Sequence, residues 1–236
     1  MTKIYWSPAF LPSQSDYDWG LLYQKPISAL SSLNKNINKE ADVTFFECPA
    51  TSNFLKNTFV LKNSMTSDLT IVNGTVIGKE PHIGAEIQHV PSIKDNNLFT
   101  YRLWWVFFTE DDSLEMTLTS PFFHQAPHLQ YGALVPGKFD IGKWFRLINL
   151  EFNLWEGVSK FVIEEDEPMA YVHFNTKEPI EMIRFQMNDQ IEKQLKSFSM
   201  STSWEPGKSL VERYLRFKKS DMKDVILKNI KDNIIV

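Results

Sequence analysis

Short apolar runs separated by turn residues dominate the middle of the chain. Between about Val43 and Phe174, aromatic and β-branched runs alternate with Pro, Gly, Asn and Asp, which is typical of antiparallel strands. Asn73-Gly74 between two such runs favours a type I′ hairpin turn over a glycosylation site. The strand candidates are Val43 to Glu47, Thr58 to Lys62, Leu69 to Ile77, Phe99 to Thr109, Leu114 to Thr119, Trp144 to Trp155, Lys160 to Ile163 and Met169 to Phe174.

Two of these candidates differ in how their faces are occupied. From Trp144 to Leu154, Ile148, Leu150 and Phe152 share one face, while polar residues take the other, as in a half-solvated strand. From Tyr101 to Phe108 both faces are mostly apolar. We therefore expect this second strand to lie centrally and to be covered on both sides, by an opposing sheet and by helices.

The hydrophobic period changes after Glu178. Ile180 to Phe198 and a tail that carries Leu210, Tyr214, Phe217, Val225 and Ile230 have helical spacing, and Pro206-Gly207 separates them. Residues 1–42 are less regular, with one short helix expected over Ser28 to Asn38. The sequence predicts a mainly β, jelly-roll-like sandwich of two antiparallel sheets over residues 43–176. An N-terminal arm, 1–42, and a C-terminal helical appendage, 177–236, are expected to pack on this domain.

Composition agrees with a folded globular chain. Of the 236 residues, 43% are apolar and 14% aromatic, enough large side chains for a sizeable core. The sequence shows neither a secretory signal pattern nor a long uncharged apolar stretch, so we expect a cytoplasmic protein. A single cysteine, Cys48, excludes an intramolecular disulfide, and its apolar surroundings predict an inert packing residue.

The charge is polarised along the chain. Residues 193–236 hold ten basic and five acidic residues, so their net charge is +5. Because the whole chain has a net charge of −4, residues 1–192 have a net charge of −9. Docking of this tail on an acidic body is favoured over nucleic-acid binding, because its apolar stripe needs burial. The acidic runs at 110–112 and 164–167 fall between strands, where solvated hairpin loops are expected.

Histidines are the main candidates for metal chemistry. No His-x-Asp, His-x-Glu or His-x-His pair occurs, so the local signature of a facial-triad iron site is absent. Dispersed ligands stay open as an alternative, with Fe, Zn or Mn as the metal and Arg146 as the anchor of a substrate carboxylate. An internal ion pair of Arg146 with Asp140 or Glu151 is the competing interpretation. The candidate ligands are His82, Glu86, His89, His124, His128 and His173.

Other local catalytic signatures are missing. The chain has no Gly-x-Ser-x-Gly elbow and no glycine-rich phosphate loop. The aromatic excess instead favours a binding surface, since surplus aromatic side chains mark interfaces.

Three segments of the chain resemble, in their order, segments of a known group of proteins. They are Phe46-Glu47-Cys48-Pro49-Ala50 with Lys56-Asn57-Thr58-Phe59, then Phe139 to Arg146, then Glu167 to Phe174. Their order resembles that of uncharacterised proteins encoded by tailed marine bacteriophages of the T4-like kind, over roughly Val43 to Phe185. The resemblance implies a viral context and no activity.

Two functional hypotheses follow. The first is a non-enzymatic phage protein that binds another protein or itself, in virion assembly or host modification, without membrane or nucleic-acid partners. The second is a metal-dependent enzyme of oxygenase or isomerase type on the jelly-roll scaffold.

Overall fold

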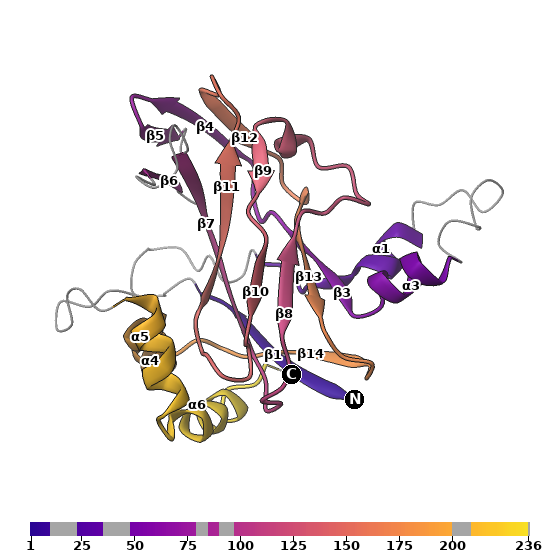
Figure 1. Ribbon diagram of the computed structural model, residues 1–236, viewed down its shortest axis with the longest axis vertical. Coiled ribbons are helices and arrows are strands. Elements are labelled where there is room, and N and C mark those ends of the chain that lie inside the picture. The colour runs from indigo at the N-terminus through magenta and orange to yellow at the C-terminus, as the bar shows by residue number, and fades with distance from the viewer. Residues whose placement is uncertain (10–22, 35–47, 79–84, 90–96, 200–208, 236) are drawn as a thin grey trace.

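The computed structural model describes residues 1–9, 23–34, 48–78, 85–89, 97–199 and 209–235 (Figure 1). Their strands are β1 (Thr2–Pro8), β2 (Ile27–Ser28), β3 (Thr58–Lys62), β4 (Ser67–Val72), β5 (Thr75–Gly78), β6 (Ala85–His89), β7 (Asn97–Phe108), β8 (Met116–Thr119), β9 (Gly132–Leu134), β10 (Gly137–Phe139), β11 (Leu147–Leu154), β12 (Lys160–Ile163), β13 (Pro168–Phe174) and β14 (Ile180–Arg184). The helices are α1 (Ala29–Asn34), α3 (Pro49–Leu55), η3 (Pro127–Gln130), α4 (Asp189–Ser199), α5 (Leu210–Lys218) and α6 (Met222–Lys231). The chain is mainly β, as predicted.

The strands form three sheets. A six-stranded sheet has the order β14-β1-β7-β11-β9, with β6 also paired to β7. A five-stranded sheet has the order β10-β8-β13-β3-β2, and a three-stranded sheet the order β12-β4-β5. All the pairs are antiparallel except β1 with β14, so the architecture is a sandwich of antiparallel sheets with one parallel edge.

The main core lies between the two large sheets. Alternate residues of β7, among them Tyr101, Trp105 and Phe107, are buried against Leu118 of β8 and Val172 of β13. The three-stranded sheet contributes further side chains to the same core, namely Leu69, Phe161 and Ile163. It closes one end of the sandwich (Figure 1).

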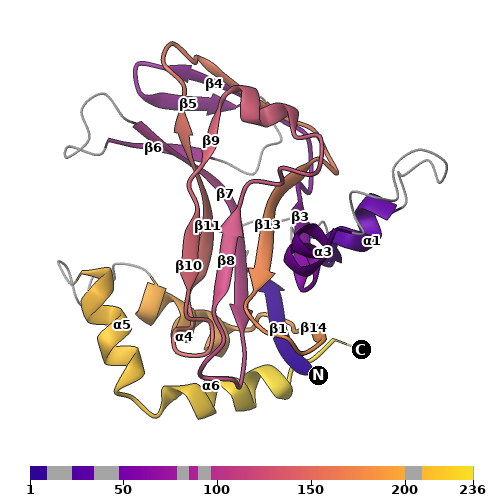
Figure 2. The same ribbon diagram turned by 45° about the vertical axis from the view of Figure 1, so that its right-hand side comes forward.

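Helices cover the outer face of each large sheet. Val106 and Phe108, on the second face of β7, are buried together with residues of α4, α5 and α6, including Leu195, Phe217 and Ile230. On the five-stranded sheet, α1 and α3 cover β3 and β13 and leave β8 and β10 uncovered within the described chain (Figure 2). The prediction that β7 is central and buried on both faces is confirmed.

The C-terminal segment docks on the body, as its apolar stripe predicts, although not every stripe residue points inward. Phe217 and Ile230 are buried, whereas Leu210 is 49% and Val225 43% exposed. The segment is two helices, α5 and α6, joined at Lys219–Asp221. Ser209 caps α5 in a reciprocal capping box with Glu212.

Two elements differ from the sequence expectation. Thr2–Pro8, expected within a packed arm, is strand β1 between β7 and β14. The predicted helix over Ile180 to Phe198 is wrong in its first half, because Ile180–Arg184 is strand β14 and helix α4 begins at Asp189. Both strands of this parallel pair thus lie outside residues 43–176, and the candidate strand Val43 to Glu47 lies outside the described residues.

The hairpin between β4 and β5 has the predicted turn. Asn73 and Gly74 have φ of 49° and 75°. A type I′ turn requires positive φ at both central residues, and Asn-Gly supplies it with little strain.

Candidate functional site

An aromatic cluster on the outer face of the five-stranded sheet is the candidate site. Phe122, in the loop after β8, is 55% exposed. Its ring centroid lies 5.4 Å from Phe54 of α3, 5.0 Å from Phe123 and 5.4 Å from Tyr171 of β13. His173 of β13 stacks on Phe54 at 5.4 Å. We call these five side chains the Phe122 surface.

A tight turn directs Phe122 outward. The His124 amide donates to the Pro121 carbonyl at 2.8 Å, and Pro121 itself is buried. The turn therefore anchors both ends of the Phe122-Phe123 pair. Because Phe122 rests on rings that are themselves fixed, it is held in place although more than half of it faces water.

His173 and Thr58 fix the neighbouring ring. The Thr58 hydroxyl donates to the Phe54 carbonyl at 2.5 Å, and its oxygen lies 2.9 Å from Nδ1 of His173. Because that hydroxyl proton is already used, His173 donates through Nδ1–H. Burial lowers the pKa of His173, so the ring is neutral near pH 7 and packs on Phe54 as an uncharged plane.

His124 links the loop to both neighbouring layers. Its Nδ1 lies 2.5 Å from the Tyr171 hydroxyl, and its Nε2 lies 3.0 Å from Oγ of Ser32 in α1. Backbone amides of Phe123 and His124 face the Tyr171 oxygen, and burial raises the pKa of this phenol. The phenol thus donates its proton to Nδ1, and His124 donates through Nε2–H to Ser32.

Ser32, His124 and Tyr171 form a row of hydrogen-bonded side chains, and the tautomer of His124 determines whether this row could activate the serine. A base that activates serine must accept the hydroxyl proton, as in a nucleophilic triad. Here Nε2 carries a proton instead. Burial, aided by the nearby Lys62, lowers the pKa of His124 and keeps the ring neutral. The row therefore serves to hold α1, the loop and β13 together.

His128 belongs to a separate, buried pair with Glu167. Its Nδ1 lies 2.7 Å from Glu167, which also accepts from the His128 amide at 2.9 Å and from the Glu164 amide at 3.0 Å. Burial lowers the pKa of His128, against the opposing effect of the Glu167 carboxylate. The expectation that residues 164–167 form a solvated loop is wrong for Glu167, which is 8% exposed.

The remaining metal-ligand candidates do not join these histidines in one described cluster. His82 lies outside the described residues, and Glu86 and His89 stand opposite Thr100 and Asn97 in the β6–β7 pair. Across the described side chains, no three His, Cys, Asp or Glu residues gather in a geometry that could hold a metal ion. His124, His128 and His173 each bond to a different partner.

Arg146, the proposed substrate anchor, packs against aromatic rings. Its guanidinium carbon lies 4.5 Å from the Trp144 ring centroid and 5.4 Å from that of Phe139. Its Nε donates to the Leu147 carbonyl at 2.9 Å. The expected internal ion pair with Asp140 or Glu151 does not form: within the described chain, Arg146 has no carboxylate partner.

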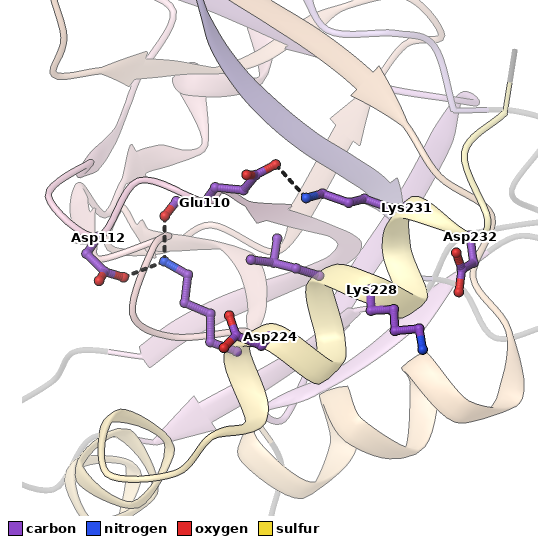
Figure 3. A pocket seen from close by; sticks show the side chains of 8 residues that line it. Glu110, Asp112, Asp224, Lys228, Lys231 and Asp232 are labelled. Carbon is purple, nitrogen blue, oxygen red and sulfur yellow. Dashed lines mark hydrogen bonds and ion pairs between the residues drawn. The ribbon is translucent and has the colours of Figure 1, made fainter.

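A charged groove of about 550 Å³ lies where α6 meets the loop after β7 (Figure 3). Lys231 pairs with Glu110 at 3.0 Å, and Lys223 pairs with Asp112 and donates to the Glu110 carbonyl at 2.8 Å. The Lys231 ammonium and the Tyr5 hydroxyl lower the pKa of Glu110. Glu110 and Asp112, which the sequence predicts in a solvated loop, therefore form ion pairs that bind helix α6 of the basic tail to the body.

Cys48 differs from its prediction as a packing residue. Its thiol is exposed at the start of α3, where the amides of Ala50 and Thr51 lower its pKa. The pair Cys48-Pro49 could have predicted that Cys48 lies at the start of a helix, because proline is favoured in the first turn of a helix.

The comparisons add no relative. No family model matches the chain, and neither the curated proteins nor the solved structures contain a match. In the described ranges, no helix has the length and apolar character needed to cross a membrane.

Proposed function

We propose that this chain is a non-enzymatic bacteriophage protein that binds another protein through the Phe122 surface. The viral context comes from the segment resemblance. The binding would serve virion assembly or host modification and would take place in the cytoplasm of the infected cell. The single observation that carries the binding role is Phe122 itself, 55% exposed on a support of fixed rings.

The chemistry of the surface defines its partner. The rings that contact Phe122 are all uncharged. The neighbouring His173 is neutral as well, because burial lowers its pKa. We expect an apolar side chain of the partner to cover Phe122, because burying a phenylalanine contributes about 1.5–3 kcal/mol. Aromatic side chains held in place are typical interface hot spots, since little rotamer entropy is lost on binding.

The metal-dependent enzyme has weaker support. Three of its candidate ligands, His124, His128 and His173, each bond to a different neighbour: Tyr171, Glu167 and Thr58, respectively. The jelly-roll connectivity expected for either function stays a prediction.

A matched pair of variants tests the binding role. Phe122→Ser removes the exposed ring, whereas Ile77→Ser removes an equally exposed apolar side chain, 55%, from the distant β4–β5 hairpin. Partners captured from infected-cell lysate by the full chain are identified, purified and titrated against both variants. We expect at least tenfold weaker binding for Phe122→Ser, equivalent to about 1.4 kcal/mol, and unchanged binding for Ile77→Ser.

Two results would overturn the proposal. One is that no captured protein binds the purified chain directly. The other is that both variants, folded by circular dichroism, bind the purified partner as the original chain does.

A further inference from the structure

Arg146 has a guanidinium that packs between aromatic rings and forms no ion pair with a carboxylate of the described chain. It lies where the end of β10 meets the start of β11, away from the Phe122 surface. Its guanidinium contacts the rings of Phe139 and Trp144, and Trp144 in turn packs on Tyr214.

The rings around Arg146 are fixed in position. Trp144 donates its indole N–H to the Phe198 carbonyl at 3.2 Å and packs on Tyr214 at 5.4 Å. Tyr214 in turn donates to Asp140 at 2.6 Å. The guanidinium thus packs against aromatic rings that are already held in place, and their π faces stabilise its positive charge.

Most of the hydrogen-bonding capacity of Arg146 is unused. A guanidinium has five N–H groups, and here the one on Nε donates to the Leu147 carbonyl. Within the described chain its terminal nitrogens have no acceptor, and they are not among the buried polar atoms that lack a hydrogen-bond partner. They therefore reach solvent, and a ligand can approach them.

Partial burial makes an unpaired guanidinium unfavourable. Burial lowers the pKa of Arg146, and the charge of Glu151, with which it forms no ion pair, opposes that effect. Cation–π contacts compensate only part of the lost hydration, because they satisfy none of the N–H donors. An external acceptor with two oxygens side by side would satisfy the exposed fork.

We infer that Arg146 forms a binding site for a carboxylate group of a ligand, against the Trp144 and Phe139 rings. A carboxylate is favoured over phosphate because it carries one negative charge, which matches one guanidinium. Glu151 acts on Arg146 from beyond ion-pair distance, and its charge would repel a doubly charged phosphate more strongly than a carboxylate.

Titration with acetate tests this site in the full chain. Ionic strength is kept constant with sodium chloride, and the N–H signals of the Trp144 indole and of Arg146 Nε are followed by nuclear magnetic resonance. We expect saturable shifts at both signals. Arg146→Met should weaken acetate binding at least tenfold, and Arg146→Lys severalfold, because lysine keeps the charge but not the planar fork.

The controls make each outcome decisive. Arg102→Met, which removes an exposed arginine from β7, should bind acetate as the original chain does. Absence of saturation, an equal effect in Arg146→Met, or undiminished binding by Arg146→Lys would overturn the inference. Tighter binding of inorganic phosphate than of acetate would overturn the carboxylate assignment. If Arg146→Met fails to fold, Arg146→Lys decides alone.

Discussion

Phe217 offers the sharpest test of how the C-terminal helices are held. It is 2% exposed, and its ring centroid lies 4.8 Å from Phe198 of α4 and 6.2 Å from Phe108 of β7, edge to face in both cases. Phe217→Ala removes a fully buried side chain, worth about 1.5–3 kcal/mol in transfer from water. Each edge-to-face pair adds about 0.5–1.5 kcal/mol. We expect a loss of about 3–5 kcal/mol in the free energy of unfolding, the usual cost of this substitution in a core.

Urea unfolding followed by circular dichroism measures this loss in the full chain. For a domain of this size, the melting temperature should fall by about 6–20 °C. Leu215→Ala is the matched control on the same helix, because Leu215 is 45% exposed and its loss should cost less than about 1 kcal/mol. Equal losses for the two variants would refute the assignment of Phe217 as the anchor of α5.

Two further predictions concern the tail and pH. Ending the chain after Pro206 removes α5 and α6, so the body should aggregate or melt earlier, while the intact chain should not retard DNA in a gel. A truncated chain that melts like the original, together with salt-sensitive retardation of DNA by the intact chain, would assign the tail to nucleic-acid binding. Stability should also fall as pH drops below about 6.5, because three histidines whose pKa is lowered by burial stay neutral in the fold while the unfolded chain binds protons. Urea unfolding between pH 7.5 and 5 measures this slope, and a flat profile would contradict it; the histidines are His124, His128 and His173.

Strands with local signals were predictable from the sequence. The run from Tyr101 to Phe108 shows apolar residues on both faces, and only a strand buried between two layers makes that pattern favourable. The Asn73-Gly74 turn has a steric cause that lies within two residues. In both cases the determining interactions are close in sequence.

The parallel edge was not predictable in this way. Ile180–Arg184 contains apolar residues that fit both a strand and the first turns of a helix. It is a strand because β1 offers a free edge, with Thr2 opposite Ile180. No local pattern reveals a partner so far away in the chain.

The surroundings of the candidate site residues could not be predicted from local sequence either. The tautomer of His124 depends on contacts with Ser32 and Tyr171, which lie 92 and 47 residues away. Likewise, Glu167 looks like the last member of an acidic loop until His128 is placed against it. The Phe122 surface joins side chains of α3, of β13 and of the loop after β8, which only the folded sheet brings together.

The position of β1 imposes an order on folding during synthesis. Its two neighbours in the sheet, β7 and β14, end at Phe108 and Arg184. At ordinary rates of translation, roughly 10–35 s pass between synthesis of β1 and completion of β14. Throughout that interval Ile4, Tyr5 and Trp6, all buried in the finished sheet, lack at least one of their strand partners. β1 thus leaves the ribosome before both of its partner strands and is enclosed only after β14 is made, so it offers chaperones an early apolar binding site.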